Sequence, residues 1–322
     1  MPILASLFFG FVPMFFFAAF VYWLDRYEKE PRILLGAAFF WGVVIAAGGA
    51  FILNTLFGIG IFIATNSEAA AEFGTASVIA PIVEEFLKGL AVGIVFLLFR
   101  REFDSILDGI IYAGIVALGF AAAENSYYIY SFGYQEGGWE GLIALVFVRV
   151  LLVGWQHPFY TAFIGIGFAV SRLSRNPLMK FIAPLMGYGV AVTTHAFHNT
   201  FGGLIGGVEG LAIGTVLDWI GWLIMLAFII WLISHERNIV RRQLHEEVSS
   251  GLITAAQYQR ALSPLTLTTA GLSGRAASRF FQVCGELAHK KDQVARQGDE
   301  GGNTLIIESL RKELAALSPL VR

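Results

Sequence analysis

Long apolar stretches, separated by short polar ones, dominate the first 234 residues of the chain. A helix that crosses a bilayer needs roughly 20 mostly apolar residues, because each residue adds about 1.5 Å against a hydrocarbon core of about 30 Å. The pattern therefore predicts an all-α, polytopic membrane bundle of about seven transmembrane helices. The predicted spans are 3–24, 33–63, 77–99, 106–130, 142–170, 178–200 and 211–234.

Positive charges between these spans indicate an orientation, because cytoplasmic loops collect Lys and Arg. The loops 64–76, 131–141 and 201–210 contain neither residue. The alternate loops carry Arg26, Lys29, Arg32, Arg100, Arg101, Arg172, Arg175, Lys180, Arg237, Arg241 and Arg242. This alternation predicts a multi-pass protein of the cell membrane, with the N-terminus outside and the C-terminus in the cytoplasm.

Residues 235–322 have a different pattern, in which charged residues, Ser, Gln and Gly are mixed into short amphipathic stretches. These stretches predict helices over 235–248, 254–262, 273–295 and 304–317. They contain no motif typical of catalysis. We therefore expect two domains: a transmembrane domain, 1–234, and a small cytosolic helical tail of unknown role, 235–322.

Composition agrees with a membrane protein. Of 322 residues, 56% are hydrophobic and 14% are charged, whereas a soluble domain has roughly 45–50% and about 25%. The net charge of −2 gives no indication of a nucleic-acid surface. The single cysteine, Cys284, excludes an internal disulfide framework. The first apolar stretch has no Lys or Arg ahead of it and is longer than a signal-peptide core, so we expect a retained span.

Ionisable side chains lie inside several predicted spans, where each costs about 2.5–3.5 kcal/mol at the helix centre. The third span carries Glu84, Glu85 and Lys88. Their spacing lets the lysine pair with either acid on one helix face. The fourth span carries Glu124 and Asn125 after three alanines, which let a neighbouring helix approach closely. Buried charges at this cost indicate a functional site.

Histidines lie on two further spans. His157, on the fifth, precedes Pro158, which should interrupt the helical hydrogen bonds and bend the chain. The sixth carries His195, His198 and Asn199, and the spacing pairs His195 with either of the others. At 1.5 Å per residue, the acids and His195 lie in the outer third of the membrane, but His157 lies nearer its middle. Either the fifth span begins later or the site is tilted inward.

Imidazole and carboxylate groups are ligands that zinc prefers, and catalytic zinc sites combine three protein ligands with one water. The metal makes its water acidic and polarises a carbonyl, while a nearby carboxylate takes the proton. Glu84 and Glu85, beside Lys88, would supply such a base. The constellation therefore predicts metal-assisted hydrolysis within the membrane.

The sequence also resembles a known family, the PrsW-type bacterial intramembrane metalloproteases of the CAAX-protease and bacteriocin-processing superfamily. The resemblance covers roughly residues 1–234, which makes this part the catalytic domain, and the tail lies outside it. The matching runs, in the order of the family, are Glu84-Glu85-Phe86-Leu87-Lys88, Gly119-Phe120-Ala121-Ala122-Ala123-Glu124-Asn125, His157-Pro158-Phe159-Tyr160-Thr161 and His195-Ala196-Phe197-His198-Asn199.

The resemblance implies a zinc-dependent endopeptidase that cuts a membrane-anchored protein near the outer face of the membrane. In PrsW itself the target is an anti-sigma factor. By analogy, the acid that activates water is Glu84 or Glu85, and the metal is held by His157 and His195 with Glu124 or Asn199. From their positions beside these residues, we expect supporting roles for Lys88, Asn125 and His198. The prenyl-protein-processing members of the superfamily have histidine where this chain has Glu124.

Other functions fit parts of this pattern. An ion or proton-coupled transporter would use the same buried acids and histidines, although such proteins often contain two related halves and the motifs are not repeated here. A retinal receptor needs a lysine in its last span, and 211–234 has none. A non-catalytic member of the same fold stays open. We expect structural roles for Asp108, Arg149 and Asp218. The sequence predicts neither the substrate nor the oligomeric state.

Overall fold

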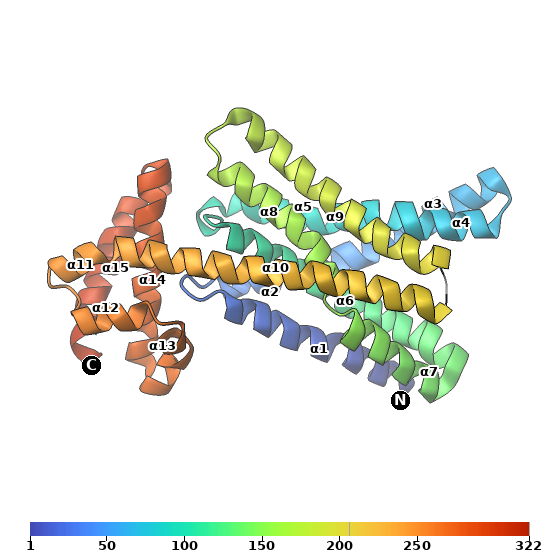
Figure 1. The fold of residues 1–322 in the computed structure, drawn as a ribbon, viewed down its shortest axis with the longest axis horizontal. Helices are drawn as coiled ribbons and strands as arrows, with labels where there is room; N and C mark the ends of the chain where they lie inside the picture. Colours follow the sequence, from blue (N-terminus) through green and yellow to red (C-terminus); the bar gives the residue numbers. More distant parts are fainter. Residues whose placement is uncertain (206, 322) are drawn as a thin grey trace. The chain divides into compact units, whose positions relative to one another are not determined.

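The computed structural model of the protein describes residues 1–205 and 207–321. Every regular element in these ranges is helical, without a strand. The chain forms two compact units: Met1–Val21 with Pro31–Ala227, and Tyr22–Glu30 with Phe228–Arg322. The long helix α10 (Gly207–Gln243) contributes to both (Figure 1). The prediction of an all-α fold is thus confirmed for the described residues.

The first unit is a helical bundle (Figure 1). Its helices are α1 (Pro2–Leu24), α2 (Arg32–Trp41), α3 (Ala47–Thr65), α4 (Glu68–Gly74), α5 (Ala80–Leu98), α6 (Ile106–Tyr128), α7 (Gln135–Val146), α8 (Gln156–Leu173), α9 (Pro177–Ile205) and the first part of α10. The described part of this unit also contains π-helical segments between these helices: η1 (Gly42–Ala46), η2 (Thr75–Ile79), η4 (Ile129–Tyr134) and η5 (Phe147–Leu152).

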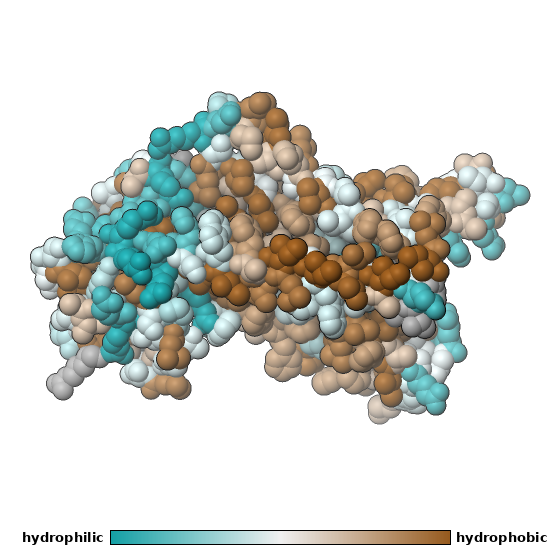
Figure 2. Space-filling view, viewed as in Figure 1, coloured by the Kyte–Doolittle hydropathy of each residue, from teal (hydrophilic) through white to brown (hydrophobic). Residues whose placement is uncertain are grey.

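Among the residues that the structure describes, four helical segments are long and apolar enough to cross a membrane: Pro2–Leu24, Arg32–Thr65, Ile106–Leu173 and Ala212–Ser249. The predicted count of seven spans is therefore not confirmed. Large apolar side chains such as Phe16, Phe51 and Phe181 are exposed on α1, α3 and α9, and Figure 2 shows such side chains gathered along α10. A soluble protein rarely exposes so much apolar surface. The chain is a multi-pass membrane protein.

Helix α6 lies at the centre of the first unit. Every residue from Leu107 to Ala122 is buried, and α6 packs against α2, α5 and α8. A helix that is apolar on all sides is expected in such a position. Its first turn is fixed by a reciprocal cap, in which Ser105 Oγ accepts a hydrogen bond from Asp108 N at 3.1 Å and Asp108 Oδ2 accepts one from Ser105 N at 2.6 Å. The structural role expected for Asp108 is this cap.

Glycines bring the backbones of the central helices into direct contact. Gly109 of α6 faces the backbone of Gly165 on α8, and Gly119 of α6 faces the backbone of Phe39 on α2. A Cβ atom at either α6 position would overlap these backbone atoms. Small residues permit this close approach of membrane helices.

The fifth predicted span, 142–170, is not one helix. Segment η5 ends at Leu152 and α8 begins at Gln156, so the helix is interrupted just before His157. Pro158 lies in the first turn of α8, where its missing N–H costs no helical hydrogen bond. The helix that carries His157 therefore begins later than the apolar pattern indicated, and the histidine lies at its N-terminal end.

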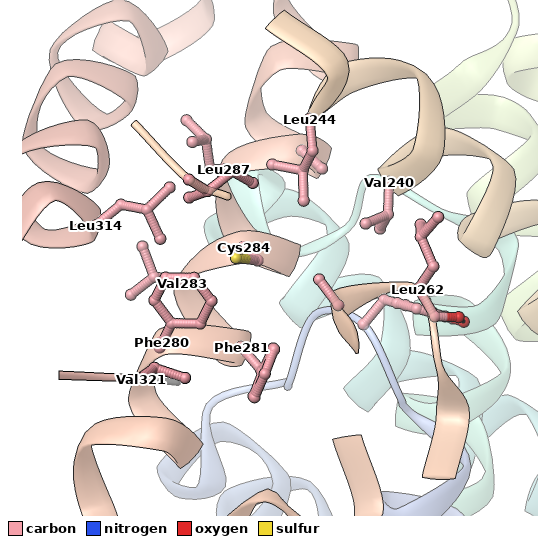
Figure 3. Packing of buried hydrophobic residues seen from close by; sticks show 14 of the residues in the cluster. Val240, Leu244, Leu262, Phe280, Phe281, Val283, Cys284, Leu287, Leu314 and Val321 are labelled. Atoms are coloured by element: carbon pink, nitrogen blue, oxygen red, sulfur yellow. The ribbon is translucent and has the colours of Figure 1, made fainter. Parts of the chain in front are cut away.

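The second unit has its own core, which α14 (Arg275–Gln297) supplies with Phe280, Phe281, Cys284 and Leu287 (Figure 3). Its other helices are α11 (His245–Ser249), α12 (Ala255–Ala261), α13 (Pro264–Thr269) and α15 (Asn303–Leu317). The sequence pattern did not predict α13. It also placed a helix start at residue 235, where α10 instead continues without a break.

Candidate metal centre

Helix α5 supplies two acids and one lysine to the interior of the first unit. Pro81 lies in its first turn, where proline is tolerated. One turn later, the side chains of Glu85 and Lys88 are fully buried, with Lys88 Nζ 2.5 Å from Glu85 Oε1. A buried ion pair needs further hydrogen bonds to offset its desolvation. The neighbouring helices α8 and α9 provide them.

Glu85 is fully engaged by these partners. The hydroxyl of Thr161, on α8, donates a hydrogen bond to Glu85 Oε2 at 2.8 Å. His195 of α9, which is 3% exposed, has its Nδ1 atom 3.0 Å from Glu85 Oε1. In the tautomer that donates this bond, Nε2 of His195 keeps a free lone pair. Glu85 therefore orients a histidine whose other nitrogen is available.

Glu84 has one carboxylate oxygen without a partner. Its Oε1 accepts a hydrogen bond from Asn54 Nδ2 of α3 at 3.3 Å. Its Oε2 is buried, has no hydrogen-bond partner among the described residues, and lies 3.9 Å from Nε2 of His195. A buried carboxylate oxygen left unpaired is costly. An ion or a water at this position would satisfy it.

His157 connects α8 to α6 and α5. Its Nε2 lies 2.8 Å from Glu124 Oε2 of α6, and its Nδ1 lies 3.3 Å from Lys88 Nζ. Glu124 Oε2 also accepts a hydrogen bond from Arg149 Nη2 at 2.5 Å. Arg149 Nε donates to Asn125 Oδ1 at 2.9 Å. This hydrogen bond explains why η5 and α6, which are both apolar segments, each carry one of these polar residues.

Three of these residues could hold one metal ion. Glu84, His157 and His195 each offer a ligand atom, and the three atoms lie within 4.8 Å of one another. Two imidazoles and one carboxylate form a known catalytic zinc set. Glu84 and His195 fit without rearrangement, because each has a free ligand atom facing the other. His157 has a partner at each nitrogen, so binding a metal requires it to release one of them.

The structure places the other predicted site residues around this group. Asn199 donates to the carbonyl oxygen of Ala76 at 2.9 Å, outside the group. His198 pairs instead with Asp218 of α10, its Nδ1 lying 2.6 Å from Asp218 Oδ2. Glu124, Asn125, Lys88 and Glu85 make the contacts described above. The sequence interpretation assigned no role to Asn54, Thr161 or Tyr160. Thr161 follows His157 by one helical turn, a spacing that could have identified it.

A cavity of about 820 Å³ reaches Glu84 from the side of α3 and α4. Its walls come from η1, α3, α4, η2, α5 and α6 and are mainly apolar. Glu84 and Glu124 both line it, together with Asn54 and Thr55. This volume is within the range of ligand pockets, which is roughly 300–1,000 Å³. The cavity therefore brings a substrate next to Glu84, whose Oε2 atom itself stays buried behind its surface.

The sequence was compared with known protein families and proteins, and the matches all belong to one family. Residues 30–232 match the family described as PrsW family intramembrane metalloprotease. The Protease PrsW of Geobacillus kaustophilus is 31% identical over 186 residues, which cover 56% of this chain and 75% of that protein. The Protease PrsW of Bacillus subtilis is 26% identical over 167 residues, or 52% and 69% of the two chains.

A third relative, the Protease PrsW of Clostridioides difficile, is 35% identical over 114 residues, which cover 34% of this chain and 46% of that protein. No solved structure matches the chain.

Proposed function

The chain belongs to the PrsW family of intramembrane metalloproteases, and on this premise we propose that it is a zinc endopeptidase whose ion is held by Glu84, His157 and His195. That it is a membrane peptidase follows from the family. The ligand set is supported above all by one observation: the unpaired Oε2 of Glu84 lies 3.9 Å from Nε2 of His195.

Each proposed histidine ligand has a carboxylate at its other nitrogen. Glu85 holds Nδ1 of His195, and Glu124 lies at Nε2 of His157. Metal-bound histidines usually donate their second N–H to such a partner, which fixes the tautomer and the ring orientation. On this arrangement His157 binds through Nδ1 and gives up its contact with Lys88. Lys88 keeps its ion pair with Glu85.

A bound zinc ion would polarise the scissile carbonyl and make its water a nucleophile near neutral pH. The proton of that water needs an acceptor in the cavity. Glu84 and Glu124 are the two carboxylates of the cluster that line it. Because Glu84 is assigned to the ion, we assign the proton to Glu124, whose charge Arg149 compensates. This reverses the roles that the family resemblance implied for these two acids.

The substrate we propose is a membrane-anchored protein with one span, such as an anti-sigma factor. An extended stretch of it would lie in the apolar cavity, with the bond to be cut beside Glu84. The proposed topology is seven spans in the cell membrane, with the N-terminus outside, cleavage near the outer face and the tail, 235–322, in the cytoplasm. The catalytic domain would then be 1–234.

The test is the zinc content of the detergent-purified protein, compared with cleavage of reconstituted single-span proteins. We expect about one zinc per wild-type chain. Glu84→Gln and His195→Ala should lose both the metal and the activity. Glu124→Gln should lose cleavage and still bind zinc, with an affinity lowered about 10–100-fold because the amide is a weaker partner for His157. Asn199→Ala, which changes a residue outside the group, serves as the matched control and should keep the zinc.

The opposite pattern for the two glutamates, with zinc kept in Glu84→Gln and lost in Glu124→Gln, would return the roles to those implied by the resemblance. A wild-type protein that cleaves its substrate in the presence of a strong chelator, with no zinc bound, would contradict the metal assignment altogether.

A further inference from the structure

A second buried polar cluster lies beside the metal centre, and no step of the proposed reaction uses it. Its centre is Asp218 of α10, which is 7% exposed. A carboxylate within a membrane bundle needs compensating partners. Three donors from other helices surround it: the hydroxyl of Tyr160 at 3.0 Å, Nδ1 of His198 at 2.6 Å and the side-chain amide of Gln156.

Tyr160 connects this cluster to the metal centre. Its ring is 1% exposed and stacks on the imidazole of His195, with ring centroids 5.0 Å apart and an interplanar angle of 20°. Its hydroxyl donates to Oδ1 of Asp218. Because the hydroxyl lies on the axis of the ring, the hydrogen bond to Asp218 fixes the position of the far end of that axis, and the contact with His195 sets the rotation of the ring about it.

His195 is therefore held in two independent ways. The hydrogen bond between Nδ1 and Glu85 lies in the plane of the imidazole and limits its rotation in that plane. The Tyr160 ring covers one face and limits tilting. Catalytic and metal-binding groups must be held within about 0.5 Å and 10–20° of their productive geometry. Neither contact alone restricts both motions.

We propose that Asp218 and Tyr160 are positioning residues for His195, with Asp218 acting through the Tyr160 hydroxyl. Gln156 and His198 complete the partners of the Asp218 carboxylate. The inference rests on the proposed function of His195 as a metal ligand. It also gives α10 a part in the site although α10 supplies no ligand to it.

The alternative is that Asp218 only joins α10 to α8. The chain offers a matched control for this, because the next residue, Trp219, also joins α10 to a neighbour: its Nε1 donates to the carbonyl oxygen of Leu152 in η5 at 2.7 Å. Trp219→Phe removes this hydrogen bond and leaves the stack on His195 in place. Because Trp219 is 40% exposed and Asp218 is buried, a structural role predicts that any loss of zinc affinity at either site follows the loss of thermal stability.

The experiment compares Tyr160→Phe, Asp218→Asn and Trp219→Phe in the full-length protein. Each variant is loaded with zinc, whose affinity is measured by competition with a chromophoric chelator, and with cobalt, whose visible spectrum reports ligand geometry. The kcat and KM are measured on a single-span protein that the wild type cuts. Thermal unfolding provides the measure of structure.

We expect zinc affinity and kcat to fall roughly tenfold or more in Tyr160→Phe and Asp218→Asn, as for other residues that orient metal ligands. KM should be unchanged, the cobalt spectrum should shift, and Trp219→Phe should match the wild type in all of these. Wild-type affinity, kcat and spectrum in Tyr160→Phe would overturn the proposal, as would an equal loss in Trp219→Phe. If the wild type cleaves without zinc, the ligand set is wrong, and the kcat of Tyr160→Phe relative to Trp219→Phe still decides the role of Tyr160.

Discussion

The carboxylate of Glu85 and the imidazole of His195 meet at 3.0 Å, between one oxygen and Nδ1. The same oxygen lies 2.5 Å from the ammonium of Lys88. Glu85 thus combines two tasks: it compensates a lysine that is fully buried, and it fixes the tautomer of a proposed metal ligand. The two tasks can be separated by mutation.

Glu85→Gln should be strongly destabilising, because it leaves the Lys88 charge buried without an anion. Breaking a buried ion pair costs about 3–5 kcal/mol, and replacing the charged acceptor of the His195 hydrogen bond by a neutral amide oxygen should lower zinc affinity by about 10–100-fold. The double variant Glu85→Gln with Lys88→Met removes both charges and should regain most of the stability but not the affinity. Thermal unfolding and zinc competition measure the two effects. Wild-type zinc binding in the double variant would refute this role of Glu85.

The cavity can be filled without touching the metal centre. Gly48 of α3 lines the cavity, and a Cβ added there meets nothing within 4 Å. Gly48→Phe should therefore fold and bind zinc normally but raise the KM for a single-span substrate about tenfold, or about 1.4 kcal/mol. Gly60 is the control: it lies on the same helix with equally open space, and it is not among the residues that line the cavity. Equal effects of Gly60→Phe would show that the cavity does not receive the substrate.

The sequence was sufficient to predict the helical class and the cluster of Glu84, Glu85, His157 and His195, because charged residues in long apolar stretches are conspicuous. Pro158 predicted a bend near His157, but the sequence did not show that the helix is interrupted before the histidine, at residues 153–155. The apolar pattern continues across residues 153–155, and only the structure shows that the helix ends there. Apolarity gives the length of a stretch but not its backbone hydrogen bonding.

The roles of the two glutamates also could not be read from their spacing. Glu84 and Glu85 are adjacent, so they point in different directions on the helix, and which one faces the cavity depends on the packing of α5 against α8 and α9. Likewise, Asn54 is an ordinary amide in an apolar stretch until α3 brings it to Glu84. Such long-range contacts leave no local signal.

The second unit should lose stability at alkaline pH through Tyr27. Burial raises the pKa of this phenol from 10 to about 12, and its hydroxyl donates to the carbonyl oxygen of Leu262 at 3.3 Å. A group with a raised folded pKa stabilises fully below its unfolded pKa, and the contribution is lost as the pH rises through the folded one. The loss should therefore occur between pH 10 and pH 12.

Alkylation of Cys284 by iodoacetamide measures this opening, since the protein has one cysteine and it is buried in the core of this unit. An exposed thiol is already ionised above pH 10, so an increase in rate reports opening rather than thiol titration. The rate should rise steeply from pH 10 to pH 12 in the wild type and less steeply in Tyr27→Phe. Parallel profiles would exclude Tyr27 as the cause.

The direct backbone contacts of α6 have a consequence for how a polypeptide enters the enzyme. Helices that touch through Gly109 and Gly165, or through Gly119 and Phe39, have no side chains between them that could rearrange. On α3, by contrast, Gly49 and Gly58 meet only the side chains of Leu87 and Thr75. We therefore expect a substrate to enter from the lipid on the flank of α3 and α4, where side chains make the contacts, and not between α6 and α8, the helix that carries His157.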